Sequence, residues 1–337
     1  MSNVYPYVGV YAMYGMTHPN DMPPALALGN PGFLAEIETL FGVKVLGIPN
    51  DFSRFITALI EKRQKPKPTM AARTITFGDV AENGPGMQHI GTASGVGLTR
   101  SELEKAKTKF EAQGLVCELV DLRMQGWAGE VLQDVPSDLL DSWSELDSAC
   151  LLVVRGGAGL LAGEAGLGAM TAEQEGLEPD KKAWMRGRVV NKLARWNLCY
   201  ADEAQQADLE NRKGTIVPFS ELPVLSHARG ELPKYFGEKG HHLNAELNVY
   251  YDVAKCGIGF HGDAERNVTI GMRLGVEIPF EYQWFLEGKP IGNRIRVELK
   301  QGDLYAMGAK AVGTDWKKRK VPTLRHAAGA AKFLKIK

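Results

Sequence analysis

The chain has 337 residues, enough for one large domain or two ordinary domains with a buried core. Forty lysines and arginines balance forty aspartates and glutamates, so bulk charge does not indicate a protein that coats nucleic acid or an anionic membrane. With 44% hydrophobic and 24% charged residues, the composition is that of a globular protein and excludes disordered, collagenous and coiled-coil classes.

The cysteines and the N-terminal sequence indicate the compartment. No basic segment followed by an apolar segment begins the chain, and no apolar run reaches the length of a membrane span. We therefore expect a soluble intracellular protein, cytoplasmic or nuclear, without a membrane partner. The four cysteines show no C-x-x-C spacing, which excludes a zinc ribbon or a secreted disulfide framework: Cys117, Cys150, Cys199 and Cys256.

Residues 1–147 alternate helical and strand patterns. Helices are predicted over 32–42 and 51–64, and strands over 43–48 and 74–80. A glycine-punctuated loop then extends to Gly97.

A capping box begins the next helix, because Thr99 is followed by Glu102 and a helical apolar face. A strand is predicted over 115–122. Residues 1–147 are thus expected to form a small α/β domain, for which we favour a structural or interaction role, since its histidines, His18 and His89, lie in loops.

A glycine-rich segment follows the apolar strand that begins near residue 150. Gly157, Gly159 and Ala162 match the G-x-G-x-x-A pattern of dinucleotide-binding proteins, with Glu178 downstream. However, residues 181–195 are polar and basic and are predicted to be helical, so no second strand follows at the required distance. We therefore interpret this segment as a strand and a turn.

The C-terminal half contains short strand-like runs at regular spacing, separated by turn sequences. This pattern predicts a sandwich or barrel rather than a parallel sheet. The runs are 245–252, 257–261, 268–275, 279–286, 294–299 and 304–307.

His261 and Asp263 are two residues apart at the end of one such run. Alternate residues of a strand face the same side, so both side chains can converge on one metal ion. His326 is the one histidine that follows them in the chain. Two imidazoles and a carboxylate suit the Fe(II) of oxygen-using enzymes, whereas an isolated H-x-D motif is common in solvated turns.

Residues 185–330 resemble the AlkB-like branch of the 2-oxoglutarate- and Fe(II)-dependent dioxygenases. Several motifs of that family occur in the family's order. They are RWNLCYAD (195–202), LNVYYD (247–252), FHGDAE (260–265), GMRLG (271–275), VELKQGDLYAMGA (297–309) and DWKKRKVP (315–322).

The resemblance implies an α+β chain in which residues 148–337 form a double-stranded β-helix (jelly roll). It also implies that Fe(II) is a cofactor, held by His261, Asp263 and a distal histidine. Asn248 and Tyr250 would contact the co-substrate 2-oxoglutarate.

Two positions depart from the family pattern. The family often places its distal histidine where this chain has Lys318, so we assign that role to His326. The family also holds the 2-oxoglutarate carboxylate with an arginine beyond the distal histidine, and no arginine follows His326 here. We expect Lys335 to take that role, ahead of the alternatives Lys332, Lys337, Arg325 and Arg273.

The resemblance further implies hydroxylation coupled to conversion of 2-oxoglutarate into succinate and carbon dioxide. The typical substrate is an N-methylated nucleobase flipped out of its strand, which releases formaldehyde. Residues 241–337 have sixteen basic and ten acidic residues. Basic runs beside Trp184 and Trp316 could follow a phosphate backbone, or could be solvated turns.

Two other function classes stay open at this point. The same apparatus could hydroxylate a protein side chain or a small metabolite, with a different lid near 181–205. Alternatively, the fold could be a catalytically inactive binding module. The oligomeric state is open.

Overall fold

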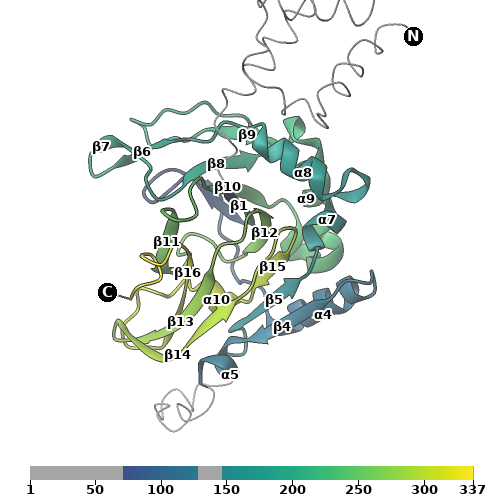
Figure 1. Cartoon of the computed structure of the whole chain (residues 1–337), viewed down its shortest axis with the longest axis vertical. Coiled ribbons are helices and arrows are strands. Elements are labelled where there is room, and N and C mark those ends of the chain that lie inside the picture. The colour runs from purple at the N-terminus through teal and green to yellow at the C-terminus, as the bar shows by residue number, and fades with distance from the viewer. Residues whose placement is uncertain (1–70, 128–145, 337) are drawn as a thin grey trace, which may run out of the picture. The chain divides into compact units, whose positions relative to one another are not determined.

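The computed structural model describes residues 71–127 and 146–336 (Figure 1). The helices expected over 32–42 and 51–64 and the strand expected over 43–48 lie outside these ranges. Among the described helices, none combines the length and the apolar character needed to cross a bilayer.

The described chain is a mixed α+β structure rich in antiparallel sheet. The larger sheet has eight strands, antiparallel except for the last pair. In spatial order they are β4 (Cys117–Asp121), β5 (Cys150–Val154), β15 (Leu304–Met307), β12 (Ile270–Gly275), β1 (Ala72–Gly78), β10 (Asn244–Tyr250), β8 (Trp196–Ala201) and β9 (Ile216–Pro218). The smaller sheet contains β11 (Gly257–His261), β16 (Thr323–Gly329), β13 (Phe280–Leu286) and β14 (Lys289–Val297).

The strand pairs of the C-terminal half are nested in the sequence. The innermost pair is β13 with β14, followed outward by β12 with β15 and β11 with β16. The next strand outward is β10. It pairs with β1, which lies much earlier in the sequence, and β1 also pairs with β12. A strand that precedes the nested set therefore occupies the place beside β10.

This pairing corrects the expected domain boundary between residues 147 and 148. Residues from Met70 onward form one compact unit, in which β1 and β4 share a sheet with strands of the C-terminal half. The described part of residues 1–147 is thus not a domain separate from the C-terminal half. Strand periodicity predicted a strand near 74–80, but periodicity does not identify the partner of a strand.

Helices cover one face of the larger sheet, and the smaller sheet lies along its other face (Figure 1). The α-helices of the described chain are α4 (Arg100–Glu111), α5 (Leu122–Gly126), α7 (Gly157–Leu161), α8 (Gly166–Glu175), α9 (Pro223–Phe236) and α10 (Ala309–Val312), with 3-10 turns at Gly163–Ala165, Phe219–Glu221 and Gly237–Gly240.

The capping box at Thr99 and Glu102 is confirmed, and it begins α4. The buried face of α4 packs with α9 and with β4 and β5. Ile75 of β1 and Leu247 of β10 belong to the same apolar cluster. Because strand side chains alternate, the residues between these apolar positions face the smaller sheet instead.

The basic segment 181–195 is a hairpin and not a helix. Strands β6 (Lys182–Met185) and β7 (Arg188–Asn191) pair across a turn at Arg186 and Gly187, which both have positive φ. That geometry is the tight hairpin turn favoured by the twist of the strands, and an R-G dipeptide is a weak signal for it. A second short hairpin, β2 (Val80–Glu82) and β3 (His89–Gly91), lies within the expected loop.

The glycine-rich segment after β5 does not belong to a parallel sheet. Strand β5 is antiparallel to both of its neighbours, β4 and β15. The rejection of a dinucleotide-binding fingerprint at Gly157 and Gly159 therefore agrees with the topology.

Candidate metal centre and its cavity

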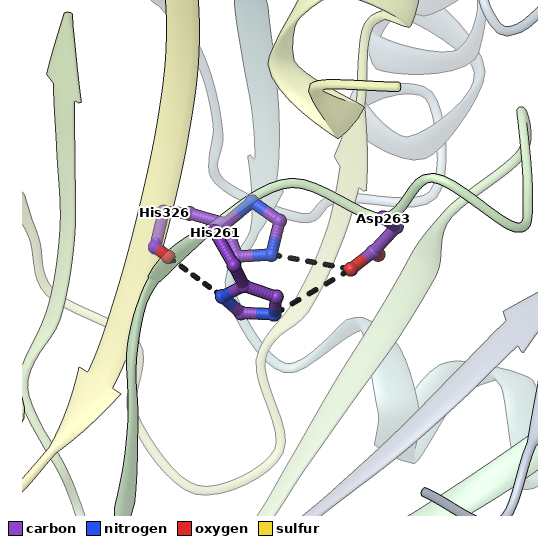
Figure 2. Close-up of side chains that lie close together, drawn as sticks. All are labelled: His261, Asp263 and His326. Atoms are coloured by element: carbon purple, nitrogen blue, oxygen red, sulfur yellow. Dashed lines mark hydrogen bonds and ion pairs between the residues drawn. The ribbon is translucent and has the colours of Figure 1, made fainter. Parts of the chain in front are cut away.

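The side chains of His261, Asp263 and His326 meet at one point (Figure 2). His261 ends β11 and lies directly opposite His326 of the neighbouring β16, and Asp263 follows in the adjoining loop. One ligand atom from each residue lies within 4.8 Å of the others. Each histidine Nε2 is 3.6 Å from Oδ1 of Asp263.

The backbone orients the His261 ring for metal binding. Its Nδ1 lies 2.8 Å from the carbonyl oxygen of Gly259 and 3.0 Å from that of His326. Because carbonyl oxygens only accept, Nδ1 carries the proton and Nε2 offers a lone pair toward Asp263. Burial, reinforced by His326, lowers the pKa of His261 to about 3, so the ring is neutral at physiological pH.

Asp263 supplies the anionic member of the cluster. Burial by itself raises the pKa of this carboxyl, but Arg266 and His326 lower it by more, and the net shift is downward. Two imidazole nitrogens and one carboxylate oxygen fit the facial donor set of non-heme Fe(II), with further positions open to ligands. The residues present thus fit the metal that the sequence suggested.

Gly262 lies between His261 and Asp263 and allows the backbone there to pass close to Gly313. A Cβ at residue 262 would lie 2.0 Å from the carbonyl oxygen of Gly313. The N–H of Asp263 donates to Val312 at 3.0 Å, which fixes this close approach. Glycine is therefore required between His261 and Asp263 in this fold.

The cluster opens into a cavity of about 570 Å³. A polar row crosses four strands of the larger sheet, and its members Asn248, Thr74 and Arg273 line the cavity. Asn197 of β8, Asn248 of β10, Thr74 of β1 and Arg273 of β12 occupy paired positions in the register. The face that points toward the smaller sheet is thus polar near the metal ligands, whereas the opposite face is apolar.

Arg273 is a buried cation in the cavity wall, only 5% exposed. Its Nη1 donates to Thr74 Oγ1 at 2.8 Å, and its guanidinium lies 5.5 Å from the centre of the Phe280 ring. That ring is itself 6.0 Å from the His326 ring. Within the described residues, Arg273 Nε is buried without a hydrogen-bond partner, so an N–H is available to a ligand.

Arg325 and Lys335, the cations predicted for 2-oxoglutarate, do not line the cavity. Arg325 is adjacent to His326 on a strand, so it points to the opposite side, where it stacks 4.1 Å from the ring centre of Phe285. Lys335 is exposed beyond the end of β16. Arg273, an alternative already considered from the sequence, does line the cavity, as do Arg195 and Arg266.

Asn248 and Tyr250, the other predicted 2-oxoglutarate residues, both line the cavity. The amide oxygen of Asn248 already accepts from Arg195 at 2.5 Å and from Asn197 at 2.7 Å. Its amide nitrogen donates to Glu246 at 3.0 Å, which leaves one N–H for a ligand. The orientation of Asn248 is therefore fixed by the protein.

Sequence reasoning missed an ionic network beside Asp263. Arg266 is buried among Glu246, Glu265 and Glu82, and all four line the cavity. A signal for Glu246 exists, because Glu246 and Asn248 are polar residues two apart within an otherwise apolar strand pattern. Glu82 lies on the unexpected β2 strand and had no comparable signal.

Comparisons with known proteins give one clear relative. The chain is 44% identical over 262 residues to "Uncharacterized protein R156" of Acanthamoeba polyphaga mimivirus, a match that covers 78% of this chain and 97% of the viral protein. No protein-family model matches the chain.

Proposed function

The chain belongs to the protein family of mimivirus R156, and we propose that it is a 2-oxoglutarate- and Fe(II)-dependent dioxygenase. The observation that carries this proposal is that a candidate metal-binding set and a buried cation line the same cavity. His261, Asp263 and His326 provide a two-histidine, one-carboxylate set, and Arg273 provides a buried cation one aromatic ring away.

The nested strand pairs support a double-stranded β-helix as the framework. In a jelly roll, strands that fold back on one another form two facing antiparallel sheets. The four pairs β13–β14, β12–β15, β11–β16 and β10–β1 fit that scheme, with β1 in the position that a strand after β16 would take.

The residues of the cavity have distinct roles in the proposed reaction. When bound, Fe(II) supplies the oxygen activation that couples decarboxylation of 2-oxoglutarate to hydroxylation of the substrate. Arg273 would hold the distal carboxylate of 2-oxoglutarate through a charge-assisted hydrogen bond from Nε. The rings of Phe280 and Tyr305 line the same cavity as Arg273 and would limit access of water to it.

A nucleobase in nucleic acid is the proposed substrate, with removal of an N-methyl group after hydroxylation. The β6–β7 hairpin supports it, because Lys182, Arg186 and Arg188 are exposed and make no ion pair within the described part of the chain. Trp184 lies on the same hairpin, and Trp316 lines the cavity. Free cations with neighbouring aromatic rings suit a single-stranded polyanion.

An anaerobic absorption spectrum tests the proposed function. The protein with Fe(II) and 2-oxoglutarate should give a weak visible charge-transfer band, and admission of oxygen should release succinate. His261→Ala should lose the band, whereas His241→Ala, at an exposed histidine outside the cavity, should retain it. A wild-type protein with neither band nor succinate would favour an inactive binding module.

A further inference from the structure

The two oxygens of Asp263 face different partners. Oδ1 lies 3.6 Å from Nε2 of both His261 and His326, so it is the oxygen that faces the metal position. Oδ2 points the other way and lies 3.7 Å from Nε of Arg266. The carboxylate is therefore divided between a metal side and a guanidinium side.

Arg266 is held rigidly in that position. It is 3% exposed, and its Nη2 lies 2.7 Å from Glu246 and 2.8 Å from Glu265. Glu246 is fixed in turn by the backbone N–H of Glu82 at 3.1 Å and by the amide of Asn248 at 3.0 Å. A buried guanidinium paired with two carboxylates has little freedom to move, since separation from them would leave uncompensated charges.

We propose that Arg266 is a positioning residue that keeps Asp263 bound to the metal through one oxygen only. The inference rests on the proposed function and adds a specific role for a residue outside the ligand set. The Glu246 carboxylate acts through Arg266 by fixing the plane of its guanidinium group.

The number of oxygens that Asp263 contributes decides how many positions stay open. On an octahedral ion, two imidazoles and one oxygen leave three positions. A keto acid that binds through two oxygens takes two of them, and one is left for molecular oxygen. If Asp263 bound through both oxygens, the keto acid and oxygen would compete for the remaining positions.

Binding measurements on the full-length protein without oxygen test this role. Mn(II) replaces Fe(II), and the affinities for Mn(II) and for 2-oxoglutarate are measured separately by calorimetry. Arg266→Lys keeps a positive charge but lacks the second nitrogen of the fork. We expect it to weaken 2-oxoglutarate binding to the Mn(II)-loaded protein by about tenfold, while Mn(II) affinity changes by less than about threefold, because a second carboxylate oxygen compensates at the metal.

Two further variants make the result interpretable. Arg73→Gln removes an arginine of β1 that pairs with Glu175 at 2.9 Å and does not line the cavity, so both affinities should match those of the wild type. If Arg266→Lys does not fold, Glu246→Gln should show the same division between the two affinities, with a smaller effect. Equal affinities in wild type and variant, or a parallel loss of both, would overturn the inference. If the wild-type protein binds no Mn(II), the proposed function fails before the variants are compared.

Discussion

Arg273 lies in the cavity wall, and its Nε is buried and unpaired within the described chain. Arg273→Gln should weaken 2-oxoglutarate binding by about tenfold or more, since a charge-assisted hydrogen bond contributes roughly 1.5–3 kcal/mol. Titration of the anaerobic charge-transfer band measures this affinity. Arg325→Gln is the matched control, and an equal effect of both substitutions would contradict the role of Arg273.

Glu82 couples the cavity to the stability of the fold. Burial, together with the Glu265 and Glu246 carboxylates, raises the pKa of Glu82 to about 7 from an ordinary 4.5. The folded protein thus binds more protons here than the unfolded chain does, so this group costs stability as the pH rises from about 4.5 to above 7.

Glu82→Gln should therefore stabilise the protein at high pH. We expect the free energy of unfolding to rise by about 2–3 kcal/mol at pH 8 and by less than about 1 kcal/mol at pH 5, because one pKa unit corresponds to about 1.4 kcal/mol. Urea unfolding at the two pH values measures the difference. Glu118→Gln, at an exposed carboxylate of β4, is the control, and a pH-independent effect of Glu82→Gln would rule out this linkage.

Residue chemistry was enough to group the three proposed metal ligands, whereas it did not favour Arg273, the proposed 2-oxoglutarate cation. His261 and Asp263 are local in sequence, and His326 was the one downstream histidine. Lys335 was expected because a strand ending there would need a cation several residues beyond the metal. The polar row that ends at Arg273 arises instead from the pairing of β1 with β10 and β12, which sequence order does not reveal.

At the scale of single elements, local signals predicted most strands and the capped helix α4. The prediction of a helix over 181–195 was wrong, because a run of basic residues around an R-G turn resembles a polar helix in sequence. What fixes its conformation is the pairing of β6 with β7 and the contact of Ala183, only 3% exposed, with the body of the protein. Such tertiary contacts override propensity in short segments.

The β6–β7 hairpin should contribute to nucleic-acid binding. The double variant Lys182→Gln/Arg188→Gln should weaken binding of a single-stranded oligonucleotide and reduce the salt dependence of log K by about one to one and a half, since each lost phosphate contact on a single strand contributes about 0.7. Fluorescence anisotropy at several salt concentrations measures both quantities. Lys105→Gln on α4 should have no effect; an unchanged salt slope in the double variant would exclude the hairpin as the contact surface.

At the scale of the whole molecule, β1 makes the unit indivisible at residue 147. A fragment of residues 148–337 would lack β1 and leave the edges of β10 and β12 unpaired, so we expect it to aggregate. A fragment of residues 70–337 should unfold cooperatively. Circular dichroism and thermal unfolding of both fragments measure this difference, and a stable 148–337 fragment would restore the boundary expected from the sequence.

We expect three side chains from β11, its following loop and β16 to bind one ferrous ion. Anaerobic equilibrium dialysis with iron determination measures this binding. One Fe(II) per chain is expected in the wild type and in His241→Ala, and loss of that iron in a folded His326→Ala variant. Full iron binding by His326→Ala would contradict it.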